Sequence, residues 1–118
     1  MATGNPVIQL KAMAFAVRIV KVRDYLVKEK HEHRISDQLF RSGTSIQANV
    51  AEAQYAVSHA DFINKMQIAL KEANESRNWI ELLFQSGFFP EAAYQSLYDD
   101  INQIVMILIA ILRTAKGK

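Results

Sequence analysis

The residues best suited to chemistry form a row of polar side chains in the middle third of the chain. Its members recur every three or four residues, so they would share one face of a helix. They are Gln38, Arg41, Ser42, Ser45, Asn49 and Glu52. Groups of these types can act in three ways: as a nucleophile with its acid or base, as a ligand site, or as a hydrogen-bond network between helices.

The catalytic interpretation has little support. Neither Ser42 nor Ser45 has a histidine placed to act as its base, and no glycine-rich phosphate loop follows a strand. Glu52, Glu72 and Glu75 can do acid or base work, but the polar seam of any helical bundle supplies such carboxylates. We therefore predict that the protein is not an enzyme, has no catalytic residues and uses no cofactor.

Histidine and glutamate side chains gather in the run EKHEHR, residues 29–34. This run breaks the apolar pattern and is typical of a polar, solvent-exposed turn. A di-iron bundle site requires Glu-x-x-His pairs that project inward from helices, and the sequence contains no such pair. We predict no metal site.

The remaining interpretation is that the polar row pairs with the helix that follows it. Small side chains around Gly43 would let the two helices approach closely, which compensates for the low helix propensity of glycine. We predict a structural network that fixes the register of helices or subunits. Its members are Arg41, Ser42, Ser45, Asn49, Glu52, Lys65, Glu72 and Glu75. The alternative is a small-ligand or catalytic site on the polar row.

Four amphipathic segments would position these residues. The apolar periodicity predicts helices over residues 6–28, 35–55, 59–86 and 90–114. Ser58 is a cap for the third helix and Gly87 ends it, while Pro90 turns the chain into the fourth. Short connections between four long helices predict an all-α fold, an up-down-up-down antiparallel four-helix bundle in one domain over residues 1–118.

The composition agrees with a single ordered helical domain. Half of the 118 residues are hydrophobic, with four glycines, two prolines and no cysteine, so disulfide and thiolate chemistry is excluded. The first 15 residues lack the basic start and long apolar stretch of a signal peptide. The longest apolar run, residues 104–112, is shorter than the roughly 20 residues of a membrane span. We expect a cytoplasmic protein without membrane contact.

Charge is unevenly distributed along the chain. Residues 1–41 hold eight Lys or Arg against four Asp or Glu, whereas residues 42–112 hold three against eight. Cations follow one side of the first helix and the C-terminal tail: Lys11, Arg18, Lys21, Lys28, Arg113, Lys116 and Lys118. They form either an ordinary solvated face or a surface that binds the phosphates of RNA or DNA.

The first and fourth helices carry more apolar surface than one bundle can bury. The first has two separate apolar stripes, although a helix of a monomeric bundle needs only one, and the fourth is apolar all round from Ile104 onward. Surface of this extent predicts a homo-oligomer. The expected interface residues are Ile104, Met106, Ile107, Ala110 and Ile111.

The central third also carries a family resemblance. The runs QLFRSGTSIQANVAEA (38–53), ADFINKMQIALKEANE (60–75) and WIELL (79–83) resemble the bacterial four-helix-bundle family named for proteins encoded in 23S rRNA intervening sequences. The likeness covers about residues 7–112 and is most specific in the middle. The family-like residues are Arg41, Ser42, Ser45, Asn49, Glu52, Lys65, Glu72, Glu75 and Trp79, none with a catalytic role.

The resemblance implies a four-helix bundle. As in the related accessory variability proteins of diversity-generating retroelements, it also implies a barrel-shaped homopentamer whose basic surface binds nucleic acid and a reverse transcriptase. This chain departs from those relatives in its modest charge excess and its acidic middle.

Overall fold

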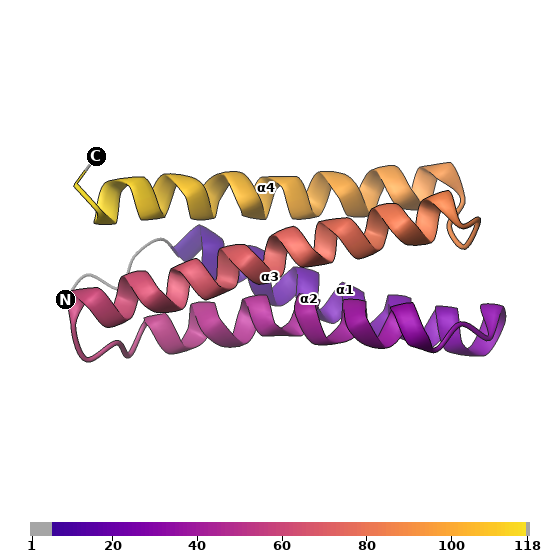
Figure 1. The fold of residues 1–118 in the computed structure, drawn as a ribbon, viewed down its shortest axis with the longest axis horizontal. Coiled ribbons are helices and arrows are strands. Elements are labelled where there is room, and N and C mark those ends of the chain that lie inside the picture. The colour runs from indigo at the N-terminus through magenta and orange to yellow at the C-terminus, as the bar shows by residue number, and fades with distance from the viewer. Residues whose placement is uncertain (1–5, 118) are drawn as a thin grey trace.

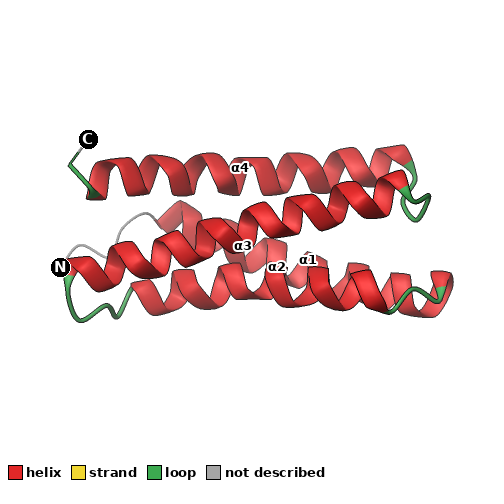
Figure 2. Cartoon of the chain, viewed as in Figure 1, coloured by secondary structure: helices red, strands yellow, loops and turns green. Residues whose placement is uncertain are grey.

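The structure, a computed structural model, describes residues 6–117 as four α-helices joined by short turns (Figure 1). The helices are α1 (Pro6–Lys30), α2 (Arg34–Ala53), α3 (His59–Gln85) and α4 (Glu91–Ala115). Figure 2 shows that only helices and turns make up this described part of the chain. The all-α four-helix bundle predicted from the sequence is confirmed. α1 runs on to Lys30 rather than ending at residue 28, and α2 ends at Ala53 rather than at residue 55.

Successive helices run antiparallel, so that α4 returns beside α1 in a bundle 45 Å long (Figure 1). The α2–α3 turn lies at the same end as the start of α1 and the end of α4, and the other two turns lie at the opposite end. Three neighbouring helix pairs pack closely along their length. The fourth pair, α1 with α4, makes the fewest contacts.

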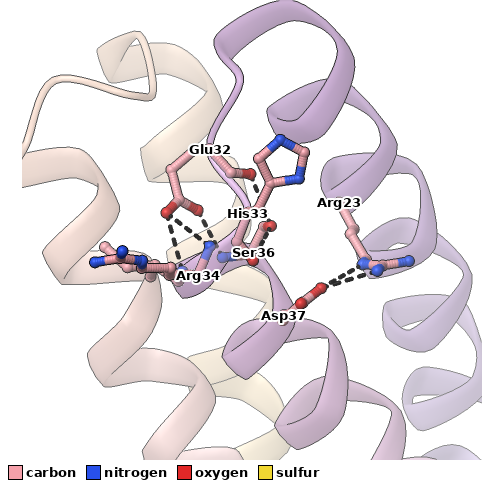
Figure 3. Close-up of polar contacts among 7 residues, drawn as sticks. Arg23, Glu32, His33, Arg34, Ser36 and Asp37 are labelled. Carbon is pink, nitrogen blue, oxygen red and sulfur yellow. Dashed lines mark hydrogen bonds and ion pairs between the residues drawn. The ribbon is translucent and has the colours of Figure 1, made fainter.

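The turn between α1 and α2 is fixed by hydrogen bonds from its own residues. His31 takes a positive φ of 56°, and the Glu32 N–H donates to the carbonyl of Leu26, which closes the end of α1. The Glu32 carboxylate then accepts from three N–H groups at the start of α2, at 2.7 to 3.1 Å (Figure 3). These donors have no partner inside the helix. Glu32 therefore caps α2. Within residues 6–117, no group of three or more His, Cys, Asp or Glu is placed to hold a metal.

The other two turns end where the sequence predicted. The Ser58 hydroxyl accepts from the Asp61 N–H at 3.0 Å and caps α3. At the far end of α3, Gly87 has a φ of 86°, a conformation that favours glycine, and Phe88 donates back to the carbonyl of Leu83 at 2.9 Å.

One apolar core runs along the bundle axis, and all four helices contribute to it. α2 lies close to α1 at Gly43, where an added Cβ would lie 3.0 Å from Cγ1 of the buried Ile19. α4 is long and apolar enough to pass for a membrane span by length and composition alone. Its seam, which includes Leu97, Ile101 and Leu108, is nevertheless buried in the bundle core.

Candidate functional site

The polar seam is the set of polar side chains along α2 and α3, and it comprises the eight predicted network residues together with Ser76 and Trp79. It contains one ion pair. Lys65 Nζ of α3 lies 2.9 Å from Glu52 Oε1 of α2. The hydrogen bond to Glu52, followed by the charge of the same carboxylate, raises the pKa of Lys65 above its ordinary value. Asp61 contributes a smaller effect in the same direction. This pair joins the two helices near the end where their own turn connects them.

A buried hydroxyl pair forms the second link of the seam. Ser42 Oγ of α2 and Ser76 Oγ of α3 lie 2.8 Å apart, and both residues are fully buried. Each hydroxyl is also placed to bond a carbonyl of its own helix, Leu39 for Ser42 and Glu72 for Ser76. The sequence analysis missed Ser76. The sequence did contain an indication of it. The core residues of α3 recur every three or four positions, and Ser76 occupies the expected core position between residues 73 and 80.

Two predicted members of the network bond within α2 instead of across to α3. The Arg41 guanidinium donates to Gln38 Oε1 at 3.0 Å, and the Asn49 amide donates to the Ser45 carbonyl at 2.9 Å. Arg41 is exposed. The prediction that Arg41 and Asn49 pair with α3 is therefore wrong, because each side chain instead bonds a group three or four residues earlier on α2.

Two polar atoms of α3 are buried without a hydrogen-bond partner among the described residues, Glu72 Oε1 and Trp79 Nε1. The neighbouring Glu75 is partly buried. Leaving such an atom unsatisfied costs about 1 to 3 kcal/mol. These atoms are therefore the positions on the seam where a water molecule or another molecule would gain most by binding.

Three of the four predicted cations on α1 are engaged by partners within the chain. Arg18 pairs with Asp100 of α4 at 2.8 Å, and Lys11 donates to Gln103 of α4 at 2.6 Å. Lys28 pairs with Asp24 of its own helix at 3.2 Å. The sequence showed the row of cations but gave no sign that α4 would supply partners for two of them.

The remaining predicted cations divide between the middle of α1 and the end of α4. Lys21, Arg113 and Lys116 are exposed, and within residues 6–117 none of their side chains has a hydrogen-bond or ion-pair partner. Lys118 lies outside the described residues. The cationic surface that is free to bind a partner is thus smaller than the sequence suggested.

The predicted oligomer interface is only partly on the surface. Ile104 is 1% exposed and belongs to the core of its own chain, so its assignment to an interface is corrected. Ile107 and Ile111 are partly buried against that core. Met106 and Ala110 are exposed, as expected for residues on the outer side of α4.

These features define a class of protein: an antiparallel four-helix bundle whose middle helices are joined by a polar seam and whose α1 and α4 expose apolar and cationic side chains. The chain belongs to the 23S rRNA-intervening sequence protein family, whose model matches residues 5–110.

A solved structure supports both fold and family. The chain is similar to a protein of unknown function from the S23 ribosomal protein family of Bacteroides thetaiotaomicron, with 47% identity and a TM-score of 0.90. The match covers 92% of this chain and 96% of that chain. A search of curated proteins gave no match.

Proposed function

We propose that the protein is a non-catalytic homo-oligomeric scaffold, a homopentamer by family resemblance. In this proposal its basic surface binds RNA or DNA, or a nucleic-acid-processing partner of the reverse-transcriptase type. One observation carries the proposal: five large apolar side chains on α1 and α4 lie half exposed or more. They are Leu10 (74%), Met13, Val17 and Val20 (50% each) and Met106 (68%). A monomeric soluble protein rarely exposes continuous apolar surface of this kind.

The nucleic-acid part of the proposal rests on the free cations. Lys21, Arg113 and Lys116 offer charge that no carboxylate of the described chain neutralises. Phosphate binding by such residues is electrostatic and independent of sequence. The similar structure carries the description of a ribosomal protein family, which supports a nucleic-acid setting for this chain.

The test is a salt series with a labelled single-stranded RNA and a labelled DNA duplex, followed by fluorescence anisotropy. We expect affinity to fall steeply with salt. Replacing Lys21, Arg113 and Lys116 by Glu removes three phosphate contacts, so the slope of log affinity against log salt for the single strand should become shallower by about 2.

Lys71→Glu is the matched control, because Lys71 is exposed on α3, a helix that carries none of the three substituted residues. This variant changes the net charge by as much as each of the three substitutions does, and it should leave most of the binding intact. If the wild-type protein binds neither probe even at low salt, the nucleic-acid part of the proposal is rejected and only the scaffold remains.

The alternative, a small-ligand site or enzyme on the polar row of α2, has one observation in its favour, the unpartnered atoms of Glu72 and Trp79. Ser42, Asn49 and Glu52 already have partners within the chain. The polar row therefore fits a structural network better than a binding site.

A further inference from the structure

A groove lies between α1 and α4 where these helices approach the α3–α4 turn. It is open to solvent and has a volume of about 420 Å³. Val22 of α1 faces Phe89, Ala93 and Leu97 across it, and these four residues form apolar walls. The groove exists because α1 and α4 are the least closely packed neighbours in the bundle.

The position of the groove is bounded by the polar contacts between the same two helices. Arg18, at one end of the groove, is held by Asp100 at 2.8 Å, and Lys11 donates to Gln103 further along. Beyond Arg18 no hydrogen bond or ion pair within the described chain joins α1 to α4. The two helices are therefore not tied to each other by a polar contact along this part of the groove.

The rim of the groove carries one free positive charge. Lys21 lines the rim, is exposed and has no ion-pair or hydrogen-bond partner within residues 6–117. The phenol of Tyr25, four residues further along α1, lines the same rim and is also without a hydrogen-bond partner in this range. The Arg18 charge is already neutralised by Asp100. Apolar walls with one cation and one hydroxyl at the edge have the size and chemistry of a small-molecule site.

We propose that this groove binds an amphiphilic monoanion, a medium-chain fatty acid or a similar acyl carboxylate. The acyl chain lies against Val22, Ala93 and Leu97, and the carboxylate accepts from the Lys21 ammonium and the Tyr25 hydroxyl. A polyanion does not fit, because the groove is apolar and offers a single uncompensated cation. This inference does not rest on the proposed nucleic-acid function, although Lys21 has a part in both.

The test compares three ligands with the same chain and different head groups: decanoate, decanol and decyltrimethylammonium, all below the concentrations at which they form micelles. Binding to the full-length protein is followed by NMR chemical shifts. We expect decanoate to bind saturably, with one site per chain, and about tenfold more tightly than decanol, because of the charge-assisted hydrogen bond. Decyltrimethylammonium should bind more weakly than both.

Two sets of variants locate the site. Lys21→Gln should remove the preference for decanoate over decanol, whereas Lys28→Gln, on the same helix and outside the groove, should keep it. Ala93→Phe fills the groove from the α4 wall and should abolish decanoate binding with an unchanged circular dichroism spectrum. Val22→Phe fills it from the α1 wall and replaces Ala93→Phe if that variant does not fold.

The proposal is overturned by any of three results: no saturable decanoate binding, binding that survives both filling variants, or a preference for decanoate that Lys21→Gln leaves intact. A fall in particle mass, measured by light scattering, on adding decanoate or on filling the groove would also overturn it. That result would assign the groove to contact with a second copy of the chain.

Discussion

Tyr94 links the start of α4 to the last turns of α3 with both its hydroxyl and its ring. The hydroxyl donates to Glu81 Oε1 at 2.5 Å, and the ring stacks on Phe84 with 4.0 Å between centroids. The hydrogen bond to Glu81, reinforced by burial, raises the pKa of Tyr94 to about 12. The same bond, helped by one from Gln85, lowers the pKa of Glu81.

Tyr94→Phe should lower the melting temperature in a way that depends on pH. Because folding raises the pKa of Tyr94 from 10.0 to about 12, the stabilisation by its hydroxyl is complete below pH 10 and is lost as the pH rises towards 12. Because folding lowers the pKa of Glu81 from 4.5, the stabilisation by this bond is lost at acid pH only below pH 4.5. The difference in melting temperature between the wild-type protein and Tyr94→Phe should therefore be constant near neutral pH and shrink above pH 10.

The stacked ring is retained in Tyr94→Phe, so the comparison isolates the hydroxyl. Melting curves followed by circular dichroism from neutral to alkaline pH give the measurement. Parallel pH profiles above pH 10 would show that the bond to Glu81 does not stabilise the fold.

The candidate site could be predicted only in part, for a reason that is visible in single residues. Glu52 and Lys65 pair across the helices as expected, since both lie near the turn that joins α2 to α3. Arg41 has a long side chain that reaches Gln38 on its own helix, and this competition depends on interhelical distances that residue spacing does not specify. Pairing near a turn was thus predictable, whereas pairing along the middle of two helices was not.

At the scale of the helices, periodicity was enough to locate all four. Apolar spacing and caps such as Ser58 placed every helix end within two residues of the observed one. The differences arise where side chains set the boundary: the backbone turn at His31 lets α1 continue to Lys30, and the Glu32 carboxylate begins α2. The sequence did not indicate that α1 packs less closely on α4, because both helices have complete apolar stripes.

Gly43 provides a test of the close approach between α1 and α2. Gly43→Ala should gain about 1 kcal/mol of helix propensity but lose about 1 to 3 kcal/mol through overpacking against Ile19, so we expect a net destabilisation of about 1 kcal/mol. In an Ile19→Ala background only the Cβ of residue 19 remains near the added Cβ, 3.4 Å away and at an ordinary contact distance, so the same change should become stabilising. Urea unfolding at one protein concentration measures both effects.

Ala48→Gly is the control for propensity alone, since Ala48 is exposed on the same helix. It should destabilise by about 1 kcal/mol in either background. If Gly43→Ala stabilises the wild-type protein by the amount that Ala48→Gly costs, the contact with Ile19 does not limit how closely α1 and α2 approach.

At the scale of the whole molecule, the surface divides by helix. α2 and α3 meet at the polar seam, while α1 and α4 expose apolar side chains, with Val17 on one and Met106 on the other. If the α1 stripe of one copy packs on the α4 face of the next, the contact is head-to-tail, the type of contact from which rings are built. If the α1 stripe packs on itself, the contact has twofold symmetry and stops at a dimer.

Val17→Asp and Met106→Asp separate these two arrangements by light scattering. We expect the wild-type mass to be about five times the chain mass of 13.4 kDa, and each variant alone to fall to a single chain, because burying an unpaired carboxylate in either half of a head-to-tail contact breaks it. Mixing the two variants should then restore pairs, since one keeps an intact α4 face and the other an intact α1 stripe. Leu82→Asp, at an apolar position of α3 with 39% exposure, should leave the wild-type mass unchanged. A normal assembly of Met106→Asp together with monomeric Val17→Asp would exclude the ring and leave α1 packed on itself.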